Sequence, residues 1–125
     1  MQDEEIIKYL LKECGGLHPY YIIHILALLD LEYIESTGRK LTGIDYQKSE
    51  YGFYSNALPQ ILEKIGVEKV SDENGNYLKL KNEKEAVHLP EDIKNKVNSI
   101  LDYFCDLSDA EMHMRVLNAK HYSEL

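Results

Sequence analysis

The sequence predicts a single domain, residues 1–125, that is mainly α-helical (α+β), with a central buried helix and one small β-hairpin. Three observations support this fold class. The chain has 125 residues, the length of one ordinary domain. Apolar residues recur at helical spacing in several segments, and a strong hairpin signal, Asn74-Gly75, lies beyond the middle of the chain. The resulting element order, three helices, a hairpin and more helix, is winged-helix-like.

The first helix is predicted from Asp3 to Glu13. Its apolar residues fall in one stripe along the helix: Ile6, Ile7, Leu10 and Leu11. Gly15-Gly16 follows directly and is expected to end the helix in a left-handed cap.

The second helix is predicted from Pro19, a good residue for a first helical turn, to Thr37, with Gly38 as the stop. Its middle, Tyr20 to Ile34, is apolar on nearly every side, which is typical of a helix buried all round. We therefore expect this helix to form the centre of the domain. Three polar residues are expected to reach solvent or a partner: Asp30, Glu32 and Glu35.

No helical period fits the stretch from Arg39 to Phe53, which contains two glycines and several aromatic residues. The interpretation is a long ordered loop with room for a short strand or a helical turn. A third helix is then predicted from Asn56 to Ile65, with Ser55 as its N-cap, Pro59 near its first turn and Gly66 as its end.

A β-hairpin is predicted from Val67 to Leu80, because Asn74-Gly75 is typical of a tight hairpin turn. Pro90 is expected to open a fourth helix that runs to about Cys105. Beyond it, Ser108-Asp109-Ala110-Glu111 has the pattern of a capping box and predicts a last helix.

The composition favours a protein partner over a nucleic acid or a membrane. The net charge is −8 and the pI about 5.1, and a field of this sign repels phosphate backbones and anionic membranes. No apolar run reaches the ~18 residues of a membrane span. The acidic start, Asp3-Glu4-Glu5, has the wrong charge for a secretory signal. We therefore expect a cytoplasmic protein with a basic protein partner, and a homodimer is left open.

Two cysteines, Cys14 and Cys105, are expected to be buried thiols in a reducing cytosol, with a disulfide left open. Ten Tyr, no Trp and abundant Ile, Glu and Lys give the composition a thermophile-like character.

The sequence carries no pattern that predicts catalysis, a cofactor or a metal. The phosphate-binding patterns G-x-x-x-x-G-K and G-x-G-x-x-G are absent, as is G-x-S-x-G. Cys14 and His18 are separated by two glycines and lack the second ligand pair of a zinc site. His24 lies on the apolar helix, where a lone histidine is typically a core residue bonded to a carbonyl. The protein is therefore expected not to be an enzyme.

The winged-helix-like order raises one alternative function, a DNA-binding transcriptional regulator. In such a protein the third helix enters the major groove and the hairpin touches phosphates. Here Lys64 on the third helix is balanced by Glu63, and the hairpin tip, Asp72-Glu73-Asn74, would repel phosphate. A basic patch remains open if the fold brings together Arg39, Lys40, Lys48, Lys79, Lys81 and Lys84.

The stretch 39–54 is the best candidate for a partner-binding surface. Loops held on a rigid scaffold often carry function, and Tyr and Arg are favoured interface anchors. The candidate residues are Arg39, Tyr46, Tyr51, Phe53 and Tyr54. The alternative is that the tyrosines pack back onto the core, and the sequence does not decide between the two.

Several segments resemble the Panacea (SocA-like) antitoxin domain family. Ile25–Ile34 is similar to a family helix with a leucine-tyrosine-x-alanine-aspartate pattern, and Thr37–Gly43 to its threonine-glycine-x-proline-leucine-threonine-glycine turn. Tyr51-Gly52 matches the tyrosine-glycine that follows there, and Ile100–Glu111 resembles the family's ending. The similarity spans about residues 20 to 115. Phe53 stands where the family usually has Pro, and the closing Trp is absent, although His121 is present.

This resemblance implies a helical fold with a small hairpin. It also implies a phage-associated or antitoxin protein that neutralises a cognate toxin by direct contact; one member of the family acts as an adaptor that delivers its toxin to a protease. The expected partner is then a toxin encoded nearby.

Overall fold

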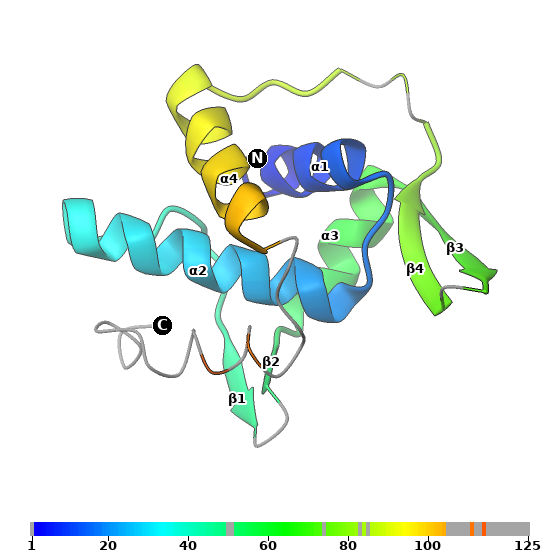
Figure 1. The fold of residues 1–125 in the computed structure, drawn as a ribbon, viewed down its shortest axis with the longest axis horizontal. Coiled ribbons are helices and arrows are strands. Elements are labelled where there is room, and N and C mark those ends of the chain that lie inside the picture. Colours follow the sequence, from blue (N-terminus) through cyan, green and yellow to red (C-terminus); the bar gives the residue numbers. More distant parts are fainter. Residues whose placement is uncertain are drawn as a thin grey trace.

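The computed structural model describes residues 2–49, 52–73, 75–82, 84, 86–104, 111 and 114. The fold is mainly helical with small antiparallel sheets, as predicted (Figure 1). In chain order the elements are α1 (Gln2–Cys14), α2 (Pro19–Thr37), β1 (Gln47–Ser49), β2 (Gly52–Tyr54), α3 (Ala57–Ile65), β3 (Val67–Asp72), β4 (Gly75–Leu80) and α4 (Glu91–Phe104). The expected succession of three helices, a hairpin and a helix is confirmed, and a second hairpin, β1–β2, lies between α2 and α3.

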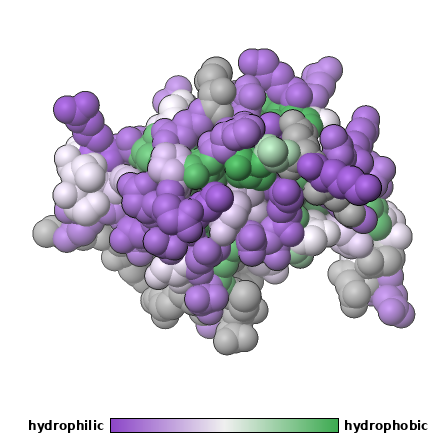
Figure 2. Space-filling model, turned by 90° about the horizontal axis from the view of Figure 1, so that it is seen from above, coloured by the Kyte–Doolittle hydropathy of each residue, from purple (hydrophilic) through white to green (hydrophobic). Residues whose placement is uncertain are grey.

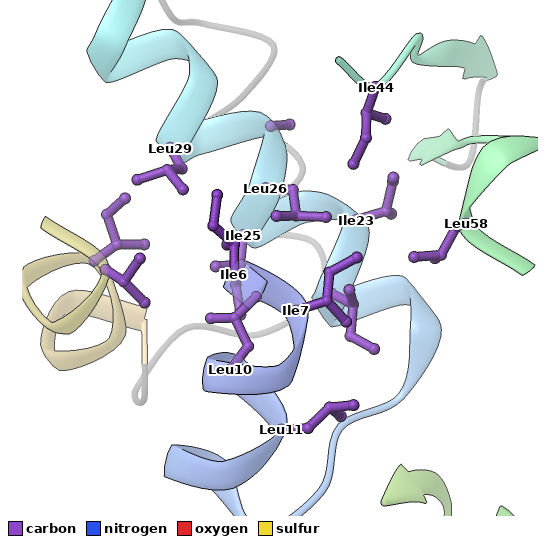
Figure 3. Packing of buried hydrophobic residues seen from close by; sticks show 14 of the residues in the cluster. Ile6, Ile7, Leu10, Leu11, Ile23, Ile25, Leu26, Leu29, Ile44 and Leu58 are labelled. Carbon is purple, nitrogen blue, oxygen red and sulfur yellow. The ribbon is translucent and has the colours of Figure 1, made fainter. Parts of the chain in front are cut away.

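Helix α2 runs through the middle of the domain and is buried on nearly every side, as the sequence predicted. It packs against α4 and against β2, while α1 packs against α3 and β4. Figure 1 shows α1 and α4 on one side of α2 and the β1–β2 hairpin projecting on the other. In Figure 3, Ile23 lies toward Ile44 and Leu58, and Leu29 lies on the side of α4. The largely apolar helix is thus stable here because other elements cover most of its surface.

Both ends of α2 are fixed by local chemistry. The side chain of His18 accepts a hydrogen bond from the Tyr20 N–H (3.1 Å), and Pro19 occupies the first turn, where it sacrifices no helical hydrogen bond. At the other end Gly38 adopts a left-handed conformation (φ 80°), and its N–H donates to the Ile34 carbonyl (2.9 Å). The start at Pro19 and the stop at Gly38 are confirmed.

The β3–β4 hairpin is attached to the helical body through the segment between α1 and α2. Strands β3 and β4 pair in register from Val67↔Leu80 to Asp72↔Gly75, which confirms the predicted hairpin; Asn74 lies outside the described residues. Leu17 and Leu78 exchange two backbone hydrogen bonds (2.9 and 2.8 Å). Gly16 permits this approach, because a Cβ there would lie 2.5 Å from the Tyr77 ring.

Helices α3 and α4 begin and end close to their predicted bounds. Ser55 Oγ accepts the Ala57 N–H (3.2 Å), and α3 starts one residue later than expected. The Pro90 carbonyl accepts the Lys94 N–H (3.1 Å), so Pro90 opens α4 as predicted. The predicted capping box, 108–111, lies outside the described residues except for Glu111, which is helical, as is Met114.

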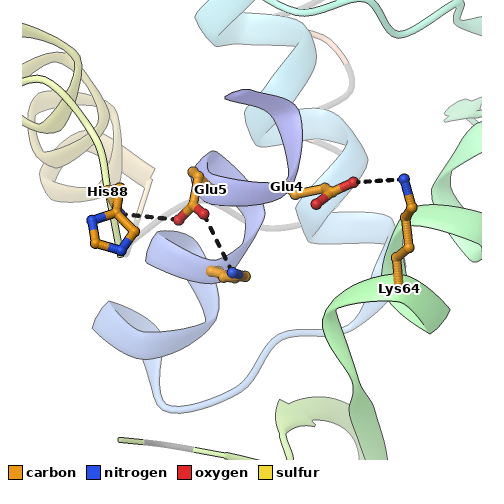
Figure 4. Close-up of polar contacts among 5 residues, drawn as sticks. Glu4, Glu5, Lys64 and His88 are labelled. Atoms are coloured by element: carbon orange, nitrogen blue, oxygen red, sulfur yellow. Dashed lines mark hydrogen bonds and ion pairs between the residues drawn. The ribbon is translucent and has the colours of Figure 1, made fainter. Parts of the chain in front are cut away.

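Acidic residues in the first turn of α1 join it to neighbouring elements (Figure 4). Glu5 accepts hydrogen bonds from the His88 N–H (3.0 Å) and from Lys8 Nζ (3.3 Å), and Glu4 forms an ion pair with Lys64 of α3 (3.3 Å). Desolvation alone would raise the pKa of Glu5, but these hydrogen bonds and the charge of Lys8 bring that pKa below its ordinary value. The stabilisation is therefore present above the ordinary pKa of a glutamate and is lost as the pH falls through the lowered value.

Two further predictions concern the burial of the cysteines and the lack of a membrane span. Cys14 is exposed at the end of α1, so the prediction of a buried thiol is wrong for this residue; Cys105 lies outside the described residues. No helix in the described part of the chain combines the length and the apolar character needed to cross a bilayer. Figure 2 shows that the face over α1 and α4 is largely hydrophilic, with hydrophobic side chains in small patches between the polar ones.

Candidate functional site

Asp30 is fully buried in α2, although its predicted place was in solvent or at a partner. The correction has a clear physical cause: the following loop folds back and supplies hydrogen-bond donors to both carboxylate oxygens. Oδ1 accepts the N–H groups of Leu41 (2.9 Å) and Thr42 (2.8 Å). Oδ2 accepts the hydroxyl of Thr42 (2.6 Å) and the hydroxyl of Tyr46 (2.6 Å). We call Asp30, Leu41, Thr42 and Tyr46 the Asp30 anchor.

The Asp30 anchor explains how the segment between α2 and β1 keeps a defined shape without regular secondary structure. A buried carboxylate is costly unless its oxygens accept hydrogen bonds, and here each oxygen accepts two. The loop backbone in turn gains acceptors that a strand or helix would otherwise supply. The sequence did contain a signal for this contact, namely one aspartate inside an apolar run, followed twelve residues later by a threonine in a turn.

Tyr46 was predicted to bind a partner, but the structure places it in the core. Its side chain is 8% exposed, and the Lys40 ammonium lies 4.9 Å above its ring while donating a hydrogen bond to the Ile44 carbonyl. Burial raises the pKa of Tyr46 well above the ordinary value, and the negative charge of Asp30 and the hydrogen bond donated to it act in the same direction. For this residue the alternative holds, in which a tyrosine packs back onto the core.

Replacing Tyr46 with phenylalanine is expected to lower the free energy of unfolding at about pH 8 by about 1.5–3 kcal/mol, because buried Asp30 loses one hydrogen bond. The folded state raises the pKa of Tyr46, so this contribution is complete below the ordinary value of 10.0 and is lost as the pH rises through the folded value. The difference between wild type and Tyr46→Phe should therefore shrink above about pH 10. Urea unfolding followed by circular dichroism at several pH values measures this.

The matched control is Tyr54→Phe, which removes a hydroxyl from an exposed tyrosine and should change the free energy of unfolding by less than about 0.5 kcal/mol. A Tyr46→Phe deficit that stays constant through the alkaline range would contradict the assigned role of the hydroxyl.

Two of the predicted partner-binding residues lie on the surface. Arg39 is exposed directly after α2, where its N–H donates to Thr37 Oγ1 (3.3 Å). Tyr54, at the end of β2, is 53% exposed. Tyr51 and the side chain of Phe53 lie outside what the structure describes. Figure 1 places the loop start at one end of α2 and β2 beneath its middle, so Arg39 and Tyr54 mark the two ends of the candidate segment.

The segment between these ends contains the β1–β2 hairpin, where a loop with room for a short strand was predicted. The pairing is antiparallel, with Gln47 opposite Tyr54 and Ser49 opposite Gly52. The side chain of Gln47 accepts the Asn56 N–H (3.2 Å), which fixes the hairpin to the start of α3. The hairpin therefore projects from the body with both of its ends fixed. Before β1, Tyr46 is bonded to Asp30, and after β2, Asn56 is bonded to Gln47.

An open groove of about 560 Å³ lies beside this loop, between the start of α1 and α3. The Gly43 N–H donates to Asp3 Oδ2 (3.1 Å), so the loop itself forms part of the groove. Its lining residues are Asp3, Glu4, Gly43, Ile44, Ala57, Gln60, Ile61, Glu63 and Lys64. Sequence reasoning missed this groove because its walls come from three distant segments.

The remaining candidates for chemistry take structural places. His24 is buried, its Nδ1 lies 2.8 Å from the Tyr20 carbonyl oxygen, and its ring stacks on that of Tyr20, which confirms the predicted core histidine. No group of three or more His, Cys, Asp or Glu residues that could hold a metal ion occurs among the described residues.

The basic residues considered for DNA are divided between opposite ends of the molecule. Arg39 and Lys40 follow the carboxyl end of α2, whereas Lys79 and Lys81 belong to β4 and its end (Figure 1). The side chain of Lys48 lies outside the described residues. The fold therefore does not join these two groups into one basic patch.

Comparison with protein-family models, with curated proteins and with solved structures finds no match to this chain.

Proposed function

We propose that this protein is a protein-interaction module of the antitoxin type, which acts in the cytoplasm by binding a basic partner protein, and that it is not an enzyme. The observation that carries the proposal is the segment 39–54. It presents Arg39 and Tyr54 to solvent on a base fixed by the Asp30 anchor. Exposed Tyr and Arg on a preordered support are the usual anchors of protein interfaces.

The charge of the chain and the sequence resemblance support the same proposal. A net charge of −8 attracts a basic protein and speeds its association. Two of the segments that carry the resemblance to the Panacea family, 25–34 and 37–43, are joined in space through Asp30 and Thr42. The resemblance adds the class of partner, a toxin encoded next to this protein.

The proposal predicts that Arg39→Ala combined with Tyr54→Ala weakens partner binding at least about tenfold, because each substitution removes a side chain that the proposal assigns to the interface. The thermal midpoint should stay within about 2 °C of wild type, because both side chains are exposed. The partner is first recovered from the native host with tagged protein and identified by mass spectrometry. Affinities are then measured by calorimetry.

The matched control is Lys84→Ala, which also removes one positive charge, here from an exposed residue outside the segment 39–54. It should leave the affinity within about twofold of wild type. Equal affinities for the double variant and this control, or the failure to recover a specific partner, would contradict the proposal.

DNA binding by a winged-helix-like module is the alternative, favoured by the position of α3 directly before the β3–β4 hairpin. Two observations weigh against it: the acidic groove on α3 and the exposed Glu73 at the hairpin tip both oppose phosphate. A gel-shift titration with the protein's own promoter region at low salt separates the two functions. A sequence-specific shift at submicromolar protein would favour the regulator.

A further inference from the structure

We infer that the groove between the start of α1, the turn at Gly43-Ile44 and α3 seats an amphipathic, positively charged segment of the partner protein. This inference rests on the proposed function and adds a second contact surface to the segment 39–54.

The walls of the groove combine an apolar floor with a charged rim. Ile44 is buried, and Ala57 and Ile61 are half-buried, so the floor is apolar and partly open to solvent. The rim carries the carboxylates of Asp3, Glu4 and Glu63. A volume of about 560 Å³ lies in the range of sites that hold small ligands, which is enough for a few side chains of a partner.

The charges that line the groove favour a positively charged occupant. Three acidic side chains and one basic side chain line the groove, which gives a formal charge of −2. Asp3 is buried and accepts a hydrogen bond from the Gly43 N–H, which holds its carboxylate at the groove wall. Glu63 is exposed, and its charge is directed to solvent or to an incoming group.

Lys64 occupies the position on Glu4 that a cation of the partner would take. It forms an ion pair with Glu4 across the groove (3.3 Å), yet its side chain is 68% exposed (Figure 4). A pair of this kind contributes little to stability, so a lysine or arginine of the partner can replace Lys64 on Glu4 at small cost. The groove is thus lined by an ion pair in which an incoming cation can replace Lys64.

Other occupants fit the groove less well. Nucleic acid and anionic lipid carry the same sign as the rim. A second copy of this chain also carries a net charge of −8, which opposes self-association. An amphipathic basic segment satisfies both the floor and the rim, as helices do in apolar grooves of other proteins.

The test is a titration of ¹⁵N-labelled full-length protein with an amphipathic leucine-lysine peptide of about 16 residues, long enough to form a helix. A leucine-glutamate peptide of equal length is the probe of opposite charge. We expect the lysine peptide alone to shift the amide signals of residues 3–4, 43–44 and 57–64, and to bind less tightly in about 0.3 M salt.

Two charge reversals distinguish the groove from the general acidity of the surface. Glu63→Lys should weaken peptide binding about fivefold or more, because it reverses a charge on the rim. Glu73→Lys makes the same change in net charge at the tip of the β3–β4 hairpin, away from the groove, and should weaken binding less than about twofold.

Shifts spread over the whole surface or centred on another element, equal effects of the two reversals, or peptide-free self-association through this face would each overturn the inference. Partner binding separates it from the proposed function. If the native partner binds Glu63→Lys as tightly as wild type but loses affinity for the Arg39→Ala, Tyr54→Ala variant, the groove inference fails and the proposed function stands. If neither variant loses affinity, both fail.

Discussion

Replacing Asp30 with alanine is expected to lower the free energy of unfolding by about 3–5 kcal/mol, a large share of the stability of a domain this size. The substitution leaves the N–H groups of Leu41 and Thr42 and the hydroxyls of Thr42 and Tyr46 without their acceptor in a buried site. Each unsatisfied buried donor costs about 1–3 kcal/mol, and partial rearrangement of the loop recovers some of that sum. Urea unfolding at neutral pH gives the loss directly.

Amide hydrogen exchange shows which part of the chain is destabilised by Asp30→Ala. The Leu41 and Thr42 amides should exchange much faster in Asp30→Ala, whereas amides at the start of α2 should change only with global stability. The matched control is Asp45→Ala, an exposed aspartate in the same loop, with an expected cost below about 0.5 kcal/mol. Similar costs for the two substitutions would show that the anchor does not hold the loop.

The second large effect is expected for Leu26→Ala, at about 3–4 kcal/mol. Leu26 is completely buried on the central helix, in the core cluster that also contains Ile6 of α1 (Figure 3). Truncation removes apolar contacts and leaves a cavity that packed neighbours on several elements cannot fill. Chemical denaturation measures the loss, and a constant m-value would show that the unfolded state is unchanged.

Leu28→Ala is the control on the same helix. Leu28 is only half-buried, so the identical change in side chain should cost clearly less, about 1–2 kcal/mol. Equal losses at the two positions would contradict the placement of α2 at the centre of the core.

The helices were predictable because their signals are local. The apolar surface of Tyr20 to Ile34 indicates burial on all sides wherever the neighbours come from, and Pro19 and Gly38 act through backbone geometry alone. The β3–β4 hairpin follows from a short turn signal next to Gly75. In each case the information lies within a few residues of the structure that it determines.

The exposure of single polar residues was not predictable in the same way. Asp30 carries a charge that ordinarily remains in water, and only the return of the loop makes its burial favourable. Tyr46 looks like an interface anchor in sequence, and the same return places its hydroxyl on Asp30. The β1–β2 hairpin is a further case, because strands as short as Gln47–Ser49 carry too few residues for an alternating pattern.

The two candidate surfaces, the segment 39–54 and the groove, also differ in how far the sequence predicts them. Arg39 and Tyr54 could be named from residue type and loop position, and both are exposed. The groove could not be named, because Asp3, Gly43 and Glu63 meet only when α1, the loop and α3 pack together. Its acidity was visible in the sequence only as a net charge with no location.

The way in which the loop is tied to Asp30 has a consequence for how recognition responds to change. A segment whose conformation is fixed during folding loses little conformational entropy when a partner binds. The cost of ordering it therefore falls on folding and does not reduce the affinity. Under the proposed function, affinity and fold stability would then depend on the same four hydrogen bonds. A substitution deep in the molecule, at Asp30 or Thr42, would weaken recognition without touching the partner at all.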